Sequence, residues 1–150
     1  MNSNQTNEGG WRDSEMRTYV NGTIYNALPS DLQSVIADTT VVSGRGYNDS
    51  YNFSTTDKLY LLSTHEVWSD DFGNDEAYST TRQLDYYSAL GVTTSNSSGA
   101  IKQYNGRNSD WWLRSARSYY ASFLYVRGGG SWGDYSAART IGVSAAFRIE

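Results

Sequence analysis

Residues 13–27 carry apolar side chains at helical spacing, which predicts an amphipathic helix in the first part of the chain. Asp13 stands where an N-cap residue is expected, and Pro29 ends the pattern because proline cannot continue a helix. Ser30 and Gln33 then have the spacing of a capping box, which predicts a second, short helix with one apolar side.

The same capping pattern predicts two further helices downstream. Ser63 and Glu66 have the spacing of a capping box and are followed by apolar residues. The segment 80–83 repeats this spacing, and Gly91 is the residue expected just beyond the end of the helix that it starts. The acidic stretch between these helices, residues 69–78, predicts a loop.

Short apolar runs predict strands in the first two thirds of the chain. Thr39–Ser43 is rich in β-branched residues and Lys58–Leu62 has the clearest strand pattern, with a polar loop over 44–56 between them. Residues 100–104 fit either a short helix or a strand. The Asn-Gly pair at 105–106 then predicts a turn.

The C-terminal part of the chain combines strands with glycine turns. Strands are predicted at 111–115, 123–126 and 142–149. The glycines at 128–130 predict a turn, after which residues 131–135 pair back as a hairpin. Because helices come first and strands last, the order predicts an α+β fold, with helices packed beside a mainly antiparallel sheet.

The chain of 150 residues has the length of one domain, with residues 1–10 predicted as a flexible tail and 11–150 as the folded part. Aliphatic residues are sparse, and 13 tyrosines and 5 tryptophans supply much of the apolar area. The net charge of −4 argues against nucleic acid or an anionic membrane as a partner, since phosphate groups attract basic surfaces. We expect no membrane insertion and see no signal-peptide pattern.

No motif for catalysis or for a resident cofactor stands out. The absence of cysteine excludes disulfides, thiol catalysis and zinc-cysteine sites. The single histidine, His65, lies in the first turn of a capped helix, where capping explains it better than a hydrolytic triad does. The acidic loop Asp70–Glu76 offers oxygen ligands for calcium, but its spacing does not match an EF-hand, so a solvated loop is the simpler interpretation. We therefore predict no catalytic residue, metal ligand or cofactor.

The composition of residues 117–141 differs from that of a protein core, because Tyr, Ser, Ala, Gly and Arg make up most of the segment. Tyrosine gives a large rigid contact area, serine and glycine adapt, and arginine supplies a planar charged group. This composition is typical of a recognition surface. Some of the aromatic residues must nevertheless face inward, since alternate residues of a strand point to opposite faces.

Two C-terminal motifs carry a resemblance to a known family: Trp-Trp-Leu-Arg-Ser at 111–115 and Gly-Val-Ser-Ala-Ala-Phe-Arg-Ile at 142–149. The chain resembles variable proteins of diversity-generating retroelements, in the subgroup similar to formylglycine-generating enzymes. Further segments that look like this family are 10–17, 57–63 and 82–87. The resemblance covers residues 10–150 and implies a C-type lectin-like fold, with a variable region at about 111–150 in the C-terminal strands and loops.

In this family an error-prone reverse transcriptase rewrites template adenines, so that Asn-type codons diversify. Substitution in the first two positions of such codons reaches Tyr, Ser, Asp, Arg, Gly, Phe and Ala, but not Trp, Gln, Lys, Met or Glu. The segment 117–141 contains no Lys, Gln, Met or Glu, which is consistent with such rewriting. Such substitution cannot produce tryptophan, so Trp132 is predicted to be part of the scaffold.

The resemblance implies a non-enzymatic ligand-binding domain, a retroelement-diversified receptor for a variable protein or glycan, displayed on a phage particle or bacterial surface. The alternatives are a fixed carbohydrate-binding lectin-like module and a structural domain of a phage tail or surface protein. The sulfatase-modifying activity found on this fold is disfavoured, because it requires cysteines. The side chains predicted to contact the ligand are Arg117, Tyr119, Tyr120, Ser122, Tyr125, Arg127, Asp134, Tyr135, Ser136 and Arg139.

Overall fold

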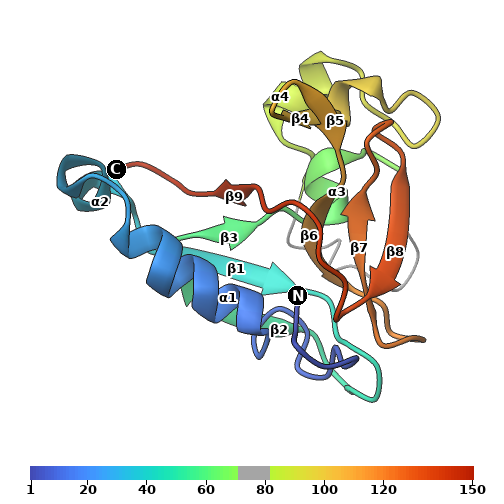
Figure 1. Cartoon of the computed structure of the whole chain (residues 1–150), viewed down its shortest axis with the longest axis horizontal. Helices are drawn as coiled ribbons and strands as arrows, with labels where there is room; N and C mark the ends of the chain where they lie inside the picture. Colours follow the sequence, from blue (N-terminus) through green and yellow to red (C-terminus); the bar gives the residue numbers. More distant parts are fainter. Residues whose placement is uncertain (71–81) are drawn as a thin grey trace.

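The computed structural model describes residues 1–70 and 82–150 (Figure 1). Within these residues the chain is a mixed α+β structure, in which short helices accompany four small antiparallel sheets. The α+β prediction is confirmed, whereas the single sheet that we expected is wrong. The described strands are two to six residues long and pair in separate clusters, so no one sheet extends through the described domain.

The N-terminal helical segment comprises α1 (Glu15–Tyr19), a π-helical turn (Val20–Ile24) and, after a break, α2 (Ser30–Val35). The first predicted helix is therefore present, with a change to π geometry in its second half. Ser14 caps it instead of Asp13, and the Ser14 hydroxyl accepts a backbone N–H of the first turn at 3.1 Å. The Asp13 carboxylate is instead held by the neighbouring arginine, at 2.6 Å.

The middle of the chain contains α3 (Thr64–Val67), α4 (Asp85–Ala89) and a 3-10 turn (Ser98–Ala100). The capping box before α3 is confirmed. The Ser63 hydroxyl accepts the backbone N–H of Glu66 at 3.2 Å, and the Glu66 carboxylate accepts the backbone N–H of Ser63 at 2.7 Å. This reciprocal pair explains how a helix of only one turn is stabilised at this position.

The other predicted caps differ from the structure. Pro29 occupies the N-cap position of α2, so the capping box expected to begin at Ser30 does not form. The N-cap of α4 is Leu84, and the box expected at 80–83 lies partly outside the described residues. Gly91 follows α4 with a φ of 62°, the left-handed conformation predicted for a residue just past a helix end.

β1 (Thr39–Ser43) and β2 (Phe53–Asp57) form an antiparallel hairpin. The prediction of β1 is confirmed, but β2 was assigned to a loop, and that assignment is wrong. The strand escaped notice because its buried residues, Thr55 and Asp57, are polar. The Asp57 carboxylate accepts hydrogen bonds from Trp11 Nε1 at 2.9 Å and from an arginine of α1 at 2.7 Å, which satisfies it inside the protein.

β3 (Tyr60–Leu61) pairs with β9 (Ala145–Ala146), so the strands expected at 58–62 and 142–149 exist only as short pieces. Gly142 forms a separate parallel bridge to the start of the central sheet. A Cβ atom on this glycine would lie 2.7 Å from a backbone carbonyl oxygen, so the close approach of the two chain segments requires glycine here.

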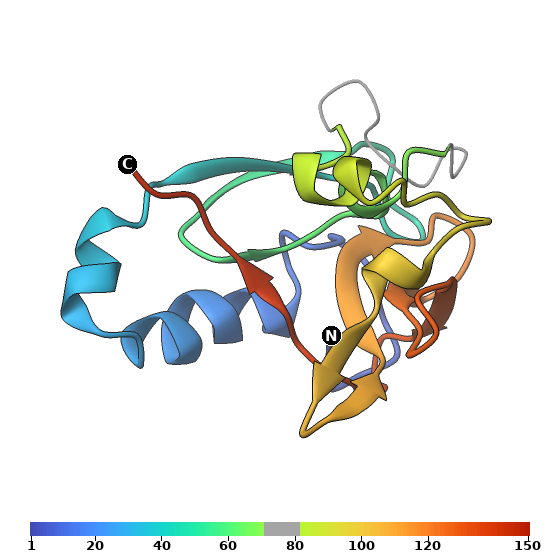
Figure 2. The ribbon, with the colours of Figure 1, turned by 90° about the horizontal axis from the view of Figure 1, so that it is seen from above.

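β4 (Lys102–Tyr104) and β5 (Arg107–Ser109) form a two-stranded ribbon that projects from the domain (Figure 2). The structure thus resolves the ambiguity over residues 100–104 in favour of a 3-10 turn that leads into a strand. Asn105 and Gly106 have φ values of 51° and 73°, and two positive values in a two-residue loop define the tight hairpin turn that this dipeptide predicts.

The central sheet consists of β6 (Trp111–Ala116), β7 (Ser122–Val126) and β8 (Trp132–Ser136), in that order. All three strands and the glycine turn between β7 and β8 agree with the prediction. Every residue of β6 and β7 is buried. Full burial of consecutive residues means that both faces of the sheet are covered.

Two hydrophobic clusters cover these two faces. On one face, Trp112 and Phe123 pack in a cluster with Trp11 and with residues of the first helices. On the other face, Leu124 packs in a cluster with Trp68 and with residues around α3 and α4. Seen from above, blue α1 and yellow-green α4 accordingly lie on opposite sides of the molecule (Figure 2).

Arg114 of β6 is buried, with 1% of its surface exposed, and it joins several elements. Its guanidinium donates to the carbonyl oxygen of Leu61 at 2.7 Å and to that of Val42 at 3.1 Å, and it forms an ion pair with Glu66. Glu66 also caps α3. One cation therefore connects β1, β3, β6 and α3, and these partners offset the cost of removing its charge from water.

Replacing Arg114 by leucine should lower the free energy of unfolding by about 3–5 kcal/mol, because the partly buried Glu66 would lose its cation and the carbonyl oxygens of Leu61 and Val42 would lose a charged donor. Urea denaturation followed by circular dichroism measures this loss. Replacing Arg82 by alanine is the matched control, since it removes an arginine that pairs with Asp85 at 2.6 Å on the surface. This control should unfold like the parent protein, and a similar loss in both variants would contradict the role given to Arg114.

Candidate functional site

The loop between β6 and β7, residues 117–121, presents Tyr119 and Tyr120 with 59% and 68% of their surfaces exposed. Backbone hydrogen bonds close this loop. The N–H of Arg117 donates to the carbonyl oxygen of Ser122 at 3.0 Å, and the N–H of Ser122 donates to that of Tyr120 at 2.7 Å. Two adjacent aromatic side chains are thus exposed on an internally bonded loop.

The backbone of this loop is held by Asn7, which is fully buried. The Asn7 Nδ2 group donates to the carbonyl oxygens of Arg117, Tyr120 and Ser122 at 2.8, 2.9 and 2.8 Å. Its Oδ1 accepts the backbone N–H of Tyr47, in the β1–β2 loop, at 2.9 Å. We call Asn7 together with these four backbone groups the Asn7 clamp. It joins three chain segments through a single side-chain amide.

Residues 1–10, which we predicted to be a flexible tail, are instead packed against the domain. Besides the clamp, the N–H of Asn2 donates to the carbonyl oxygen of Ala137 at 2.9 Å, and the N–H of Gly9 donates to the Asp49 carboxylate at 2.8 Å. The segment is mostly polar, so its attachment rests largely on individual hydrogen bonds, to which the buried Met1 adds an apolar contact. Hydropathy does not reveal such contacts, which is why the tail prediction failed.

The β1–β2 loop, residues 44–52, contributes two further exposed tyrosines that the sequence analysis did not consider. Tyr47 and Tyr51 have 45% and 80% of their surfaces exposed. The Asp49 carboxylate accepts the backbone N–H of Gly46 at 2.9 Å and fixes the turn between them. Tyrosines within a Gly-, Asn- and Asp-rich loop are the signal that could have identified this segment, since such loops lie at the surface.

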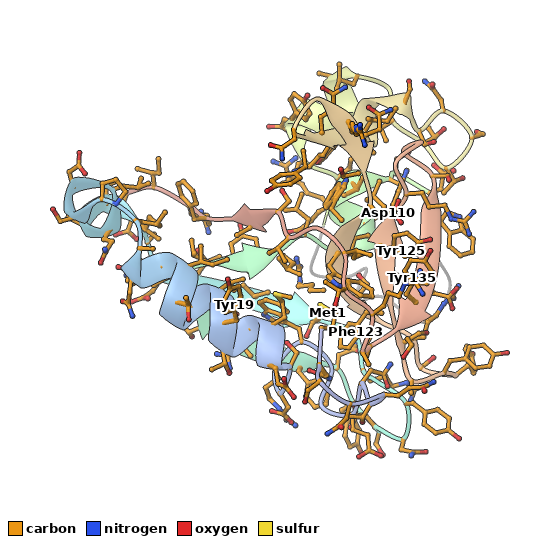
Figure 3. All side chains as sticks on the ribbon, viewed as in Figure 1. Met1, Tyr19, Asp110, Phe123, Tyr125 and Tyr135 are labelled. Atoms are coloured by element: carbon orange, nitrogen blue, oxygen red, sulfur yellow. The ribbon has the colours of Figure 1, made fainter. Side chains whose placement is uncertain are left out.

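Two side chains predicted to contact a ligand are buried in the central strand β7. Ser122 and Tyr125 have 6% and 3% of their surfaces exposed, which corrects their assignment. The Tyr125 ring stacks on that of Tyr135, with centroids 4.3 Å apart, and meets Trp112 edge-on (Figure 3). Burial raises the pKa of the Tyr125 hydroxyl. The two rings therefore belong to the packing of the sheet.

β8 is the outer strand of the sheet, and its side chains alternate between the two faces. Asp134 and Ser136 lie on one face and Tyr135 on the other. The Arg117 guanidinium lies 3.6 Å from the Asp134 carboxylate and 5.3 Å from the centroid of the Trp132 ring. Trp132, predicted as scaffold, is 38% exposed and is therefore part of the surface. Its outer-strand position explains the difference.

The two remaining predicted side chains lie on the Tyr135 side of the sheet. The Arg139 guanidinium lies 4.8 Å from the centroid of the Tyr135 ring, and Arg127 forms a hydrogen bond with the Tyr125 hydroxyl. Both arginines are exposed. The ten predicted side chains therefore do not form one patch. They divide between the exposed β6–β7 loop, the two faces of β8 and the buried strand β7.

Residues 1–70 and 82–150 contain no group of three or more His, Asp or Glu side chains that could hold a metal ion. Of the acidic loop considered for calcium, only Asp70 lies among these residues, and its carboxylate accepts hydrogen bonds from the backbone and hydroxyl of Thr94. His65 lies in the single turn of α3, as expected. Within the same residues, no helix has the length and apolar character needed to cross a bilayer.

A protein family matches the chain over its whole length, residues 1–150, and its description is Domain of unknown function (DUF6273). The chain belongs to this family. No curated protein and no solved structure matches the chain. The family description names no activity, so the function rests on the arrangement of side chains given above.

Replacing Asn7 by alanine should lower the free energy of unfolding by about 2–3 kcal/mol, because the N–H of Tyr47 and the carbonyl oxygen of Arg117 lose the amide as partner, and the carbonyl oxygens of Tyr120 and Ser122 each lose one of two donors. The N–H of Tyr47 should also exchange faster with solvent in hydrogen-exchange NMR. The exposed Asn4 is the control, and its replacement by alanine should change neither quantity. Unchanged exchange at Tyr47 in the Asn7 variant would show that the clamp does not hold the two loops.

Proposed function

We propose that this protein is a non-enzymatic ligand-binding domain with a C-type lectin-like fold, and that it acts as a receptor diversified by a retroelement. The observation that carries the proposal is the exposed pair Tyr119 and Tyr120 on a loop held by the Asn7 clamp. Tyrosine is among the residues that contribute most to binding energy at interfaces. A loop whose backbone is already held in place also loses little conformational freedom on binding.

Neighbouring groups give this surface further chemistry. The exposed Tyr47 lies on the loop that the clamp joins to the β6–β7 loop, and we propose that its ring extends the aromatic contact area. Arg117 and Asp134 provide charges of both signs beside the exposed Trp132. Charged groups around an aromatic contact mainly determine which partner is accepted. The proposed target is accordingly a protein or a glycan.

The contrast between β6 and the loop that follows it supports diversification of this region. All six residues of β6 are buried, so substitution there would disturb the core. In the adjoining loop, Tyr119 and Tyr120 face solvent, so exchange of these side chains alters recognition directly. In the proposed role, the domain is displayed on a phage particle or bacterial surface, where a changeable target selects among variants.

The genomic neighbourhood tests this proposal directly. We expect a near-copy of the segment encoding residues 111–150 beside a reverse transcriptase gene, with differences only at adenines of the copy. The differing codons should include those of Tyr119 and Tyr120 and should exclude those of residues 111–116. DNA sequencing of the flanking region checks this. Absence of the copy would overturn diversification, and ligand screening with and without calcium would then test a fixed lectin-like module.

Replacing Tyr119 and Tyr120 together by alanine should change the free energy of unfolding by less than about 0.5 kcal/mol, because neither ring is part of the core. The same double variant should lose binding when the labelled domain is applied to a glycan array and to a panel of bacterial cells. Tyr125→Ala serves as the contrasting variant, and it should cost about 3–5 kcal/mol in chemical denaturation. Retained binding by the double variant would place the contact surface elsewhere.

A further inference from the structure

A cleft lies between the β4–β5 ribbon and the chain segment that precedes β9. Its volume is about 470 Å³, which is within the range of about 300–1,000 Å³ occupied by small-molecule sites. It does not include the β6–β7 loop or the Asn7 clamp. The side chains that line it include Lys102, Tyr104, Asp110, Trp111, Val143 and Ser144.

The ammonium group of Lys102 is the unusual feature of this cleft. Its Nζ atom donates to the Ser144 hydroxyl at 2.6 Å and lies 4.4 Å from the centroid of the Trp111 ring. In the part of the chain that the structure describes, Lys102 forms no ion pair. The only other lysine, Lys58, lies 3.2 Å from the Asp38 carboxylate. Among the described residues, Lys102 is therefore a cation without an ion-pair partner, placed against the Trp111 ring.

A partly buried cation without a counter-ion is unfavourable, because burial removes water and supplies no compensating negative charge. Burial accordingly lowers the pKa of the Lys102 ammonium. A carboxylate brought into the cleft would reverse this effect by supplying the missing partner. The Ser144 hydroxyl accepts a hydrogen from Lys102 and still has its own hydrogen to donate, so it could bind the same carboxylate.

Asp110 limits the charge that the cleft can accept. Its Oδ1 atom accepts the N–H of Gly128 at 2.8 Å, which fixes the carboxylate at the wall of the cleft. The cleft thus offers one ammonium and one carboxylate, with Tyr104 and Val143 as apolar surface. A ligand with a single negative charge would pair with Lys102, whereas a doubly charged ligand would also be repelled by Asp110.

We propose that this cleft is a binding site for a monovalent carboxylate attached to an apolar or aromatic group. The carboxylate contacts Lys102 Nζ and the Ser144 hydroxyl, and the apolar body lies against Tyr104 and Val143. Because none of these residues belongs to the tyrosine-bearing loops, the site is independent of the recognition surface proposed above. Failure of either proposal leaves the other unaffected.

Benzoate and benzamide form a matched pair of probes, since they share one shape and differ in charge. We expect benzoate to bind saturably and to shift the Trp111 indole N–H signal in ¹H–¹⁵N NMR. Benzamide should bind at least about tenfold more weakly, because it cannot pair with the ammonium. Benzoate affinity should fall as the pH rises through the lowered pKa of Lys102, while benzamide affinity should not. Equal binding of the two probes would overturn the proposal, as would no saturable shift with benzoate.

Substitutions in the cleft test whether benzoate binds at Lys102 and beside Asp110. Lys102→Gln should weaken benzoate binding at least about tenfold, and Lys58→Gln, the control at the only other lysine, should leave it unchanged. Asp110→Asn keeps an oxygen for the N–H of Gly128 but removes the like charge, so it should strengthen benzoate binding about twofold or more. Unchanged affinity in both cleft variants would overturn the assignment. The benzamide comparison and Asp110→Asn remain decisive if Lys102→Gln does not fold.

Discussion

The contact on which the rest of the structure depends is the ion pair between the buried Arg114 and the partly buried Glu66. The guanidinium donates to carbonyl oxygens on β1 and β3 and to a carboxylate that also caps α3, so these three elements share one partner on β6. Arginine suits this position because its planar group directs several donors in fixed directions, which lysine cannot do. The pair fixes the position of β6 within the domain, and hence the point at which the β6–β7 loop leaves the core.

Other buried or partly buried polar side chains connect elements in the same way. Asp57 joins β2 to Trp11, and Asn7 joins the N-terminal segment to two loops. Asn21 accepts the backbone N–H groups of residues 58 and 59 through its amide oxygen. In a chain with few aliphatic residues, these contacts hold elements that share little apolar area. Each is satisfied in only one arrangement, so the contacts favour a single fold over similar alternatives.

The sequence predicts those parts of the fold that are organised by local apolar patterns. The three strands of the central sheet and the capping box before α3 belong to this group. β2 was missed because its inward side chains are Thr55 and Asp57, and the docking of residues 1–10 was missed because it depends mainly on hydrogen bonds, those of Asn7 above all. The site could be predicted only in part. Tyr119 and Tyr125 have the same chemistry, and only the central place of β7, a non-local property, buries one and leaves the other exposed.

The Asn7 clamp has a consequence for how this chain can change. Its four hydrogen bonds all join backbone atoms to Asn7. The clamp therefore depends on the number of residues between β6 and β7 and not on the identity of their side chains. One inserted or deleted residue would move a carbonyl oxygen away from the amide, whereas an exchanged side chain would not. The length of the loop is therefore fixed, while its sequence is not. Substitutions can therefore accumulate in this loop, whereas insertions and deletions would break the contacts that hold it.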